Sequence, residues 1–161
     1  MEEIAPDYAR RLEKTAQSAA AKLREMSDAV AGSRPAPDKW CPKEILGHLI
    51  DSAVNNHVRF VRAAQEEELV FSGYDQEHWV TSQGYASADW LALVALWESQ
   101  NLHLARVMAL TPKAIRLAIR PVHNLGQVAW HALPKGRPAT LEYLMEDYVH
   151  HVQHHLDQIL K

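Results

Sequence analysis

The sequence predicts an all-α protein, a four-helix bundle with two long connections. Its 161 residues are 47% hydrophobic and 23% charged, a globular balance in a chain long enough for one hydrophobic core. Apolar residues repeat at helical spacing in four stretches of about twenty residues, and no series of strands is evident. We therefore expect a single domain over residues 1–161, with a helix order that need not be simple up-down-up-down.

The first two helices are indicated by their end signals. The first is expected from about Pro6 to Ala31, because the Gly- and Pro-containing run at residues 32–37 ends it. The second begins at Pro42, whose missing N–H costs nothing in a first turn, and continues to about Ala64.

The last two helices also begin at capping residues. Ser87-Ala88-Asp89 opens a third helix that runs through Leu110 and ends at Thr111-Pro112, and Thr140 caps the fourth. Residues 66–86 lack a clear period and form a first connection with room for a short turn of helix. Residues 111–139 contain four prolines and form a second connection, outside any helix except at its start.

Four of the last twelve residues are histidines, arranged as the doublets His150-His151 and His154-His155. Residues four apart on a helix are neighbours, so two imidazoles at this spacing can reach one cation. At roughly 100° per residue, His151 and His155 border the apolar face of the fourth helix, whereas His150 and His154 point into water. The alternative is that clustered histidines simply solvate a C-terminal helix.

A third ligand must come from elsewhere, and the second helix contains His48 and His57. On burial alone we expect His57, because it lies along the apolar line of that helix. His48 lies instead on a polar stripe, and such a stripe is usually solvated surface, although it can also be the wall of a wet cleft. A catalytic metal belongs in a cleft, so the residues leave both histidines open. The polar stripe consists of His48, Ser52, Asn55, Arg59 and Arg62.

Charge and cysteine content exclude several classes of function. The net charge of −3 and the absence of a Lys/Arg block argue against a nucleic-acid surface. No signal-peptide pattern or membrane-length apolar run is present, so we expect a cytoplasmic protein without a membrane partner. The single cysteine, Cys41, allows no internal disulfide and no thiolate-rich zinc site, and it has no obvious base to activate it as a nucleophile. Any metal must therefore be held by nitrogen and oxygen ligands.

Three runs of residues resemble the DinB-like superfamily, and within it the metal-dependent hydrolases and the bacillithiol S-transferase relatives. The runs are Trp40-x-Pro42-x-Glu44-Ile45-Leu46-Gly47-His48-Leu49-x-Asp51-Ser52, Asn55-Asn56-x-x-Arg59-Phe60 and Asp147-Tyr148-Val149-x-His151-x-x-x-His155-Leu156-x-Gln158-Ile159. The resemblance implies a three-histidine site for a divalent metal formed by His48, His151 and His155. It therefore favours His48 over His57. It also implies a homodimer.

Three neutral imidazoles leave a divalent metal with open positions, as expected of a catalytic site. The resemblance thus implies a metal-dependent enzyme, a hydrolase or a thiol S-transferase, with zinc or nickel expected first and iron or manganese as alternatives. Its partner would be a small-molecule substrate, including a low-molecular-weight thiol. The rival interpretation is a non-catalytic bundle that binds metal or a protein partner.

Further residues are candidates for supporting roles. Asp147, one turn before His151, is placed to orient that ligand, although an acid at this spacing is commonly just a surface charge. Asn55 and Arg59 share the face of His48 and are candidates to bind an anionic group of the substrate. Aromatic residues of the two connections are candidates to roof a pocket, or equally to cover the ends of the core. They are Tyr74, Trp79, Tyr85 and Trp130.

Overall fold

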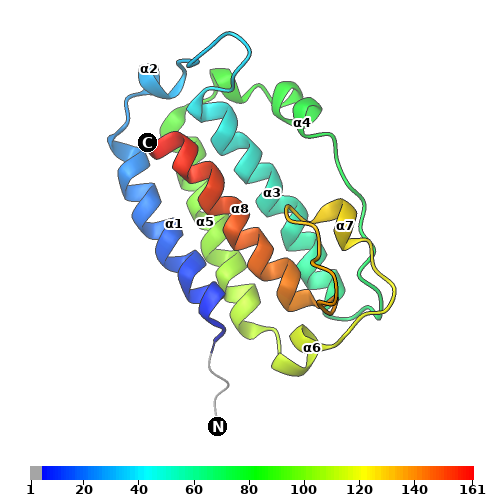
Figure 1. Cartoon of the computed structure of the whole chain (residues 1–161). Coiled ribbons are helices and arrows are strands. Elements are labelled where there is room, and N and C mark those ends of the chain that lie inside the picture. The colour runs from blue at the N-terminus through cyan, green and yellow to red at the C-terminus, as the bar shows by residue number, and fades with distance from the viewer. Residues whose placement is uncertain (1–4) are drawn as a thin grey trace.

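A computed structural model describes residues 5–161 and shows four long helices with short helical turns in the connections (Figure 1). No β-strand occurs within these residues; one isolated bridge pairs Leu69 with His123. The prediction of an all-α fold is therefore confirmed. The long helices are α1 (Asp7–Glu25), α3 (Pro42–Ala63), α5 (Trp90–Leu110) and α8 (Leu141–Leu160). The short ones are α2 (Asp28–Ala31), α4 (Gln76–Ser82), the 3₁₀ turn η1 (Tyr85–Ser87), α6 (Lys113–Leu117) and α7 (Leu125–Val128).

The predicted helix starts are confirmed by their caps. The Asp89 carboxylate accepts a hydrogen bond from the Ala92 N–H at 2.8 Å, which opens α5. The Thr140 hydroxyl accepts from the Tyr143 N–H at 3.1 Å, which opens α8. Such caps satisfy backbone donors that have no partner within the helix, so short-range sequence signals locate these starts well.

Two expectations about the helices are wrong in detail. The first helix ends at Glu25 and not at Ala31, because the Ser27 hydroxyl accepts from the Val30 N–H at 3.2 Å and starts α2 instead. The second connection contains α7 in addition to the α6 turn at its start.

The helix order around the bundle is α1, α5, α3 and α8, each packed on the next, with α8 packed on α1. Figure 1 shows that α1 and α8 run in one direction and that α3 and α5 run in the other. The connection after α3 returns along the length of the bundle, so α3 and α5 are parallel neighbours. The order is thus not simple up-down-up-down, and α3 faces α8 in antiparallel orientation.

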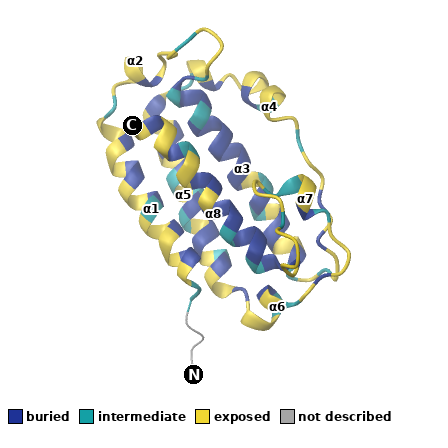
Figure 2. Ribbon diagram, viewed as in Figure 1, coloured by how far each residue is buried: buried dark blue, intermediate teal, exposed yellow. Residues whose placement is uncertain are grey.

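The face of α3 toward α8 and the connections is buried (Figure 2), and several of its residues are polar. It is held in place partly by Gly47, where a β-carbon would lie 2.2 Å from the ring of Tyr85. This close approach lets the Tyr85 hydroxyl donate to the Asp51 carboxylate at 2.6 Å. The buried polar residues of this face are His48, Asp51, Ser52, Asn56 and Arg59.

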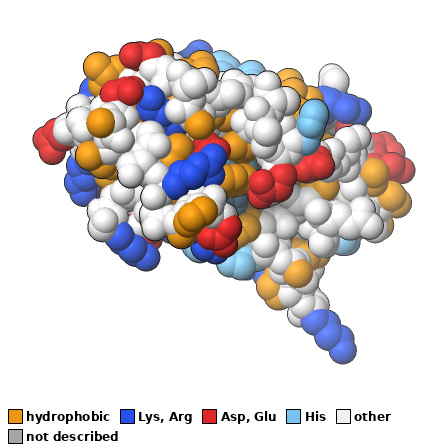
Figure 3. Space-filling view, turned by 90° about the horizontal axis from the view of Figure 1, so that it is seen from above, with side chains coloured by type: hydrophobic (Ala, Val, Ile, Leu, Met, Phe, Trp, Pro, Cys, Tyr) orange, Lys and Arg blue, Asp and Glu red, His pale blue; other side chains and the backbone are white. Residues whose placement is uncertain are grey.

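The surface has a mixed character. On the face seen in Figure 3, acidic and basic side chains are interspersed, so this face carries no uniform patch of one charge. Among the residues described, no helix is long and apolar enough to cross a membrane.

Candidate metal centre

Three histidines from two helices meet in the interior between α3 and α8. His48 comes from α3, and His151 and His155 come from α8. One ring nitrogen of each lies within 4.8 Å of the others, and the Nε2 atoms of His48 and His151 are 3.2 Å apart. The predicted trio is therefore brought together by the packing of the two helices.

The expectation of a buried His57 as the ligand is wrong. His48 is 1% exposed, whereas His57 is half-buried and lies edge-on to the ring of His103, away from the trio. The helical wheel failed here because it treats polar residues as solvent-facing. On α3 most of the polar stripe faces α8 and the connections, so His48, Ser52 and Arg59 are buried without being apolar, while Asn55 is half-buried and Arg62 is exposed.

Hydrogen bonds fix which nitrogen each ligand offers. The Nδ1 atom of His151 lies 3.4 Å from the Ser52 hydroxyl, and the Nδ1 atom of His155 lies 2.8 Å from the Gln158 side-chain oxygen. Their Nε2 atoms are thereby left for a cation, an arrangement typical of histidines that bind metals. Neither Ser52 nor Gln158 was predicted in this role, although Ser52 lies four residues after His48 and Gln158 lies three residues after His155.

Burial keeps the three imidazoles neutral. It lowers the pKa of His48 from 6.5 to about 4, with a smaller contribution from His155. Burial also lowers the pKa of His151 far below its ordinary value, and that of His155 in the same direction, with neighbouring histidines adding to both shifts. Neutral imidazole is the form that binds a metal ion, so the trio is a ready ligand set at neutral pH.

The donor set fits a divalent cation. Two nitrogens that each bind a metal at 2.0–2.1 Å in tetrahedral geometry lie about 3.3 Å apart, close to the observed 3.2 Å between His48 and His151. In addition, His48 Nδ1 is a buried polar atom with no hydrogen-bond partner among the residues described.

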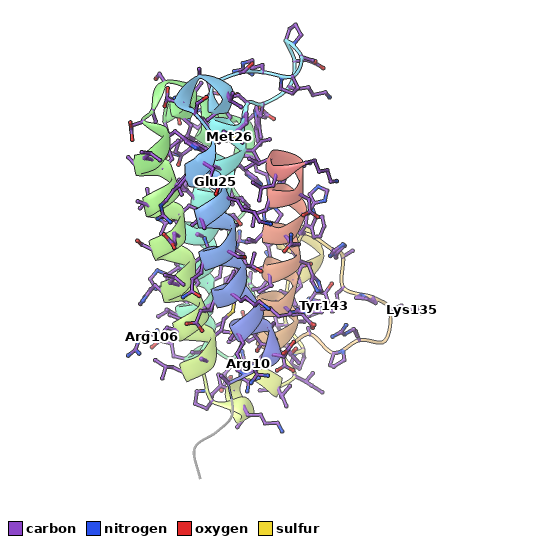
Figure 4. The ribbon with its side chains drawn as sticks, turned by 90° about the vertical axis from the view of Figure 1, so that its left-hand side faces the viewer. Arg10, Glu25, Met26, Arg106, Lys135 and Tyr143 are labelled. Carbon is purple, nitrogen blue, oxygen red and sulfur yellow. The ribbon has the colours of Figure 1, made fainter. Side chains whose placement is uncertain are left out.

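The expectation that Asp147 orients His151 is wrong. The Asp147 carboxylate accepts from the Trp130 and His131 N–H groups at 2.7 and 2.9 Å and also lies 3.0 Å from His131 Nδ1. It therefore fastens the second connection to α8. The Tyr143 hydroxyl helps by donating to the backbone oxygens of residues 131 and 132. In Figure 4 the loop that contains Lys135 projects away from the bundle, and Tyr143 lies on α8 close to where this loop leaves the bundle.

A cavity of about 300 Å³ opens beside His151, between α3, α8 and the two connections. Arg59 lines it as expected, but Asn55 does not, because its side chain donates to the Asp51 backbone oxygen. The next residue, Asn56, lines the cavity in its place.

Of the four aromatic residues in the connections, Tyr74 and Trp130 line this cavity. Trp79 packs on Tyr74 from outside, and Tyr85 is buried at Asp51. Trp130 also contacts the rings of His151 and His154, with centroids 5.8 and 4.9 Å away. Part of the pocket wall is thus built by connections whose sequences show no helical period.

The other histidines of α8, His150 and His154, are exposed as expected. Among residues 5–161, the trio of His48, His151 and His155 is the one cluster with metal-ligand geometry. Fold and site together define a helical bundle with a three-histidine centre beside a cavity.

Comparison with known proteins agrees with this class. The profile of the DinB superfamily matches residues 11–159, and the chain belongs to this superfamily. A solved structure of YfiT from Bacillus subtilis is similar, with a TM-score of 0.70 and 20% sequence identity over 99% of this chain and 87% of that one. YfiT is described as a probable metal-dependent hydrolase with an unusual four-helix bundle topology. No curated protein matches the chain.

Proposed function

We propose that this protein is a divalent-metal-dependent enzyme that transforms a small molecule bound in the cavity beside the three histidines. The observation that carries the proposal is the convergence of three neutral imidazoles, from two helices, next to a cavity that one of them lines. Hydrolysis is the first candidate reaction, and the description of YfiT as a probable metal-dependent hydrolase supports it.

Different residues would bind the metal and hold its ligands in position. His48, His151 and His155 would hold the metal, and Ser52 and Gln158 keep two of those rings in position. A divalent metal held in this way lowers the pKa of a bound water or thiol toward neutrality and polarises a carbonyl group.

The cavity wall would orient the substrate against that metal. The phenol of Tyr148 is committed to Asn101 at 2.6 Å, so its ring shapes the wall without offering a free hydroxyl. Trp130, whose ring centroid lies 5.8 Å from that of His151, would cover part of the approach to the reacting group.

Thiol S-transfer is the second candidate, and the state of Asp147 favours it. Within the described lining of the cavity, Asp147 is the only carboxylate, and it is occupied by two backbone N–H groups and His131. No carboxylate of this described lining is therefore free to act as a base for a water that the metal does not itself ionise. A metal held by these histidines would help a thiol to lose its proton to solvent. The thiolate sulfur would then attack an electrophilic carbon, forming a C–S bond while the leaving group departs with the electron pair of the bond that breaks.

The test is a parallel assay of hydrolysis and thiol transfer on untagged protein. Zinc- and nickel-loaded samples are compared with chelated protein, with His151→Ala and with His154→Ala as the matched control. We expect activity only with metal, its loss in His151→Ala and its retention in His154→Ala. Turnover of esters or amides would assign hydrolysis, and metal-dependent consumption of a small thiol with an electrophile would assign transfer. A site that binds one metal tightly but supports neither reaction would contradict the enzyme proposal and favour a metal-binding bundle.

A further inference from the structure

Arg59 is a buried cation in the wall of the cavity beside the histidines. Arg59 is 6% exposed. It lies on α3 two turns after Ser52, on the same face of the helix, and lines the cavity. One Nη atom donates to the Ser72 backbone oxygen at 3.0 Å, which ties the first connection to the helix. A guanidinium has five N–H donors, so most of its hydrogen-bonding capacity remains for something else in the cavity.

No side chain of the described residues neutralises this charge. The carboxylate of Asp147, on the same wall, is engaged by Trp130 and His131. The carboxylate of Asp51 accepts hydrogen bonds from Tyr85 and Gln83 through Oδ1, and no ion pair of the described residues joins it to Arg59. Tyr74 lies near Arg59, but burial raises the pKa of its phenol, so it stays uncharged at neutral pH.

The pKa of Arg59 reflects the unfavourable burial of its unpaired charge. Burial lowers the pKa of the Arg59 guanidinium, which remains protonated because its ordinary value is so high. Charged side chains that are nearly fully buried are normally paired. An anion that enters the cavity would supply the missing pair and form short, charge-assisted hydrogen bonds.

We propose that the cavity binds small molecules that carry a carboxylate or a related oxyanion, with that group held by Arg59 and the reacting group at the histidine end. The substrate class is thus an anion with its charge remote from the reacting atoms. The position of the reacting group rests on the proposed function. The anion subsite rests on Arg59 and the cavity alone.

The spacing along α3 separates the two ends of the ligand. His48 and Arg59 are eleven residues apart, which corresponds to about 16 Å along a helix axis. The Arg59 side chain covers part of this spacing, because side chains on a helix lean toward its N-terminus. The proposal assigns the anionic group and the reacting group to different parts of the molecule. Anion binding at Arg59 should therefore not require a metal at the histidines.

The test measures the binding of benzoate and of its neutral isostere benzamide by calorimetry, on the full chain with zinc bound and after chelation. We expect benzoate to bind about tenfold more tightly than benzamide, or more, with and without metal. Phenyl phosphate in the same assay decides which oxyanion the subsite prefers. Equal binding of benzoate and benzamide, or binding of neither, would overturn the proposal.

Variants of two arginines on one helix supply the matched comparison. Arg59→Gln should reduce benzoate affinity to that of benzamide. Arg62→Gln should leave the ratio unchanged, because Arg62 is exposed and pairs with Glu66. If circular dichroism shows that Arg59→Gln does not fold, the ratio of benzoate to benzamide affinity in wild type, before and after chelation, still tests the proposal. A preference for benzoate that is retained in folded Arg59→Gln would overturn the assignment to this residue. A preference that is lost on chelation would show that the anion binds to the metal.

The outcomes also separate this proposal from the proposed function. Retained benzoate selectivity in a protein without metal-dependent turnover would defeat the enzyme proposal and leave the anion subsite standing. Metal-dependent turnover without benzoate selectivity would defeat the anion subsite and leave the enzyme proposal standing.

Discussion

Two histidine pairs on α8 have the same spacing and opposite surroundings. His151 and His155 face α3, where His48 completes a cluster within 4.8 Å, while His150 and His154 lie exposed on the outer side. The sequence spacing of the two pairs is identical. Spacing alone therefore identifies histidines that could bind one cation together, but it does not identify which pair forms a site. What distinguishes the pairs is the neighbouring helix, which adds a third imidazole, excludes water and keeps the rings neutral.

The same contrast recurs on α3 between His48 and His57, and replacing each in turn should give the largest effect. We expect His48→Ala to remove most of the bound metal, because two imidazoles on one helix turn hold a cation far more weakly than three. His57→Ala should leave the metal content of folded protein unchanged. Elemental analysis of both variants checks this, and substantial metal loss in His57→Ala would contradict the site.

Removal of the groups that orient the ligands should have a smaller effect. Ser52→Ala and Gln158→Ala should each weaken metal affinity roughly 10–100-fold, since these side chains hold His151 and His155 in position. Competition with a chromophoric chelator measures the change. The control is Gln153→Ala, whose side chain donates to Asp157 on the exposed side of α8. An equal loss in the control would show that the effect does not arise from ligand orientation.

Chelation should lower the melting temperature without unfolding the helices. The bundle has its own apolar core, so its folding does not depend on the metal as that of a zinc finger does. A metal at 100 times its dissociation constant adds about 2.7 kcal/mol, or roughly 5–10 °C for a chain of this size. Calorimetry should show this shift in wild type and in His150→Ala, but not in His151→Ala. Loss of the helical circular-dichroism signal at room temperature would instead mark the centre as structural.

Acid should destabilise the metal-free protein through the buried histidines. The pKa of His48 is about 4 in the native state against 6.5 ordinarily, so between these values the unfolded chain binds more protons than the native one. The free energy of unfolding should therefore fall as the pH drops from 6.5 toward 4. His48→Gln should show a shallower fall in urea titrations of chelated protein over this range. A fall as steep as that of wild type would mean that His48 is not buried in the neutral form.

Local signals predicted the helices well, and the same signals could not predict the cleft. Asp89 and Thr140 cap their helices with contacts three residues away, which a sequence displays directly. The burial of His48 depends instead on α8 and on two connections without periodicity. Family resemblance, and not the helical wheel of α3, selected His48. Asp147 failed as a predicted partner of His151 because its true partners, at Trp130 and His131, belong to such a connection.

Partner helices, and not histidine spacing, create the candidate metal centre of this protein. Metal content distinguishes the two explanations when it is measured in wild type and in four untagged alanine variants, at His150, His151, His154 and His155. We predict one tightly held metal per chain in wild type, its loss in His151→Ala and His155→Ala, and nearly unchanged content in His150→Ala and His154→Ala. Equal loss in all four variants, or several weakly held ions in wild type, would contradict the claim.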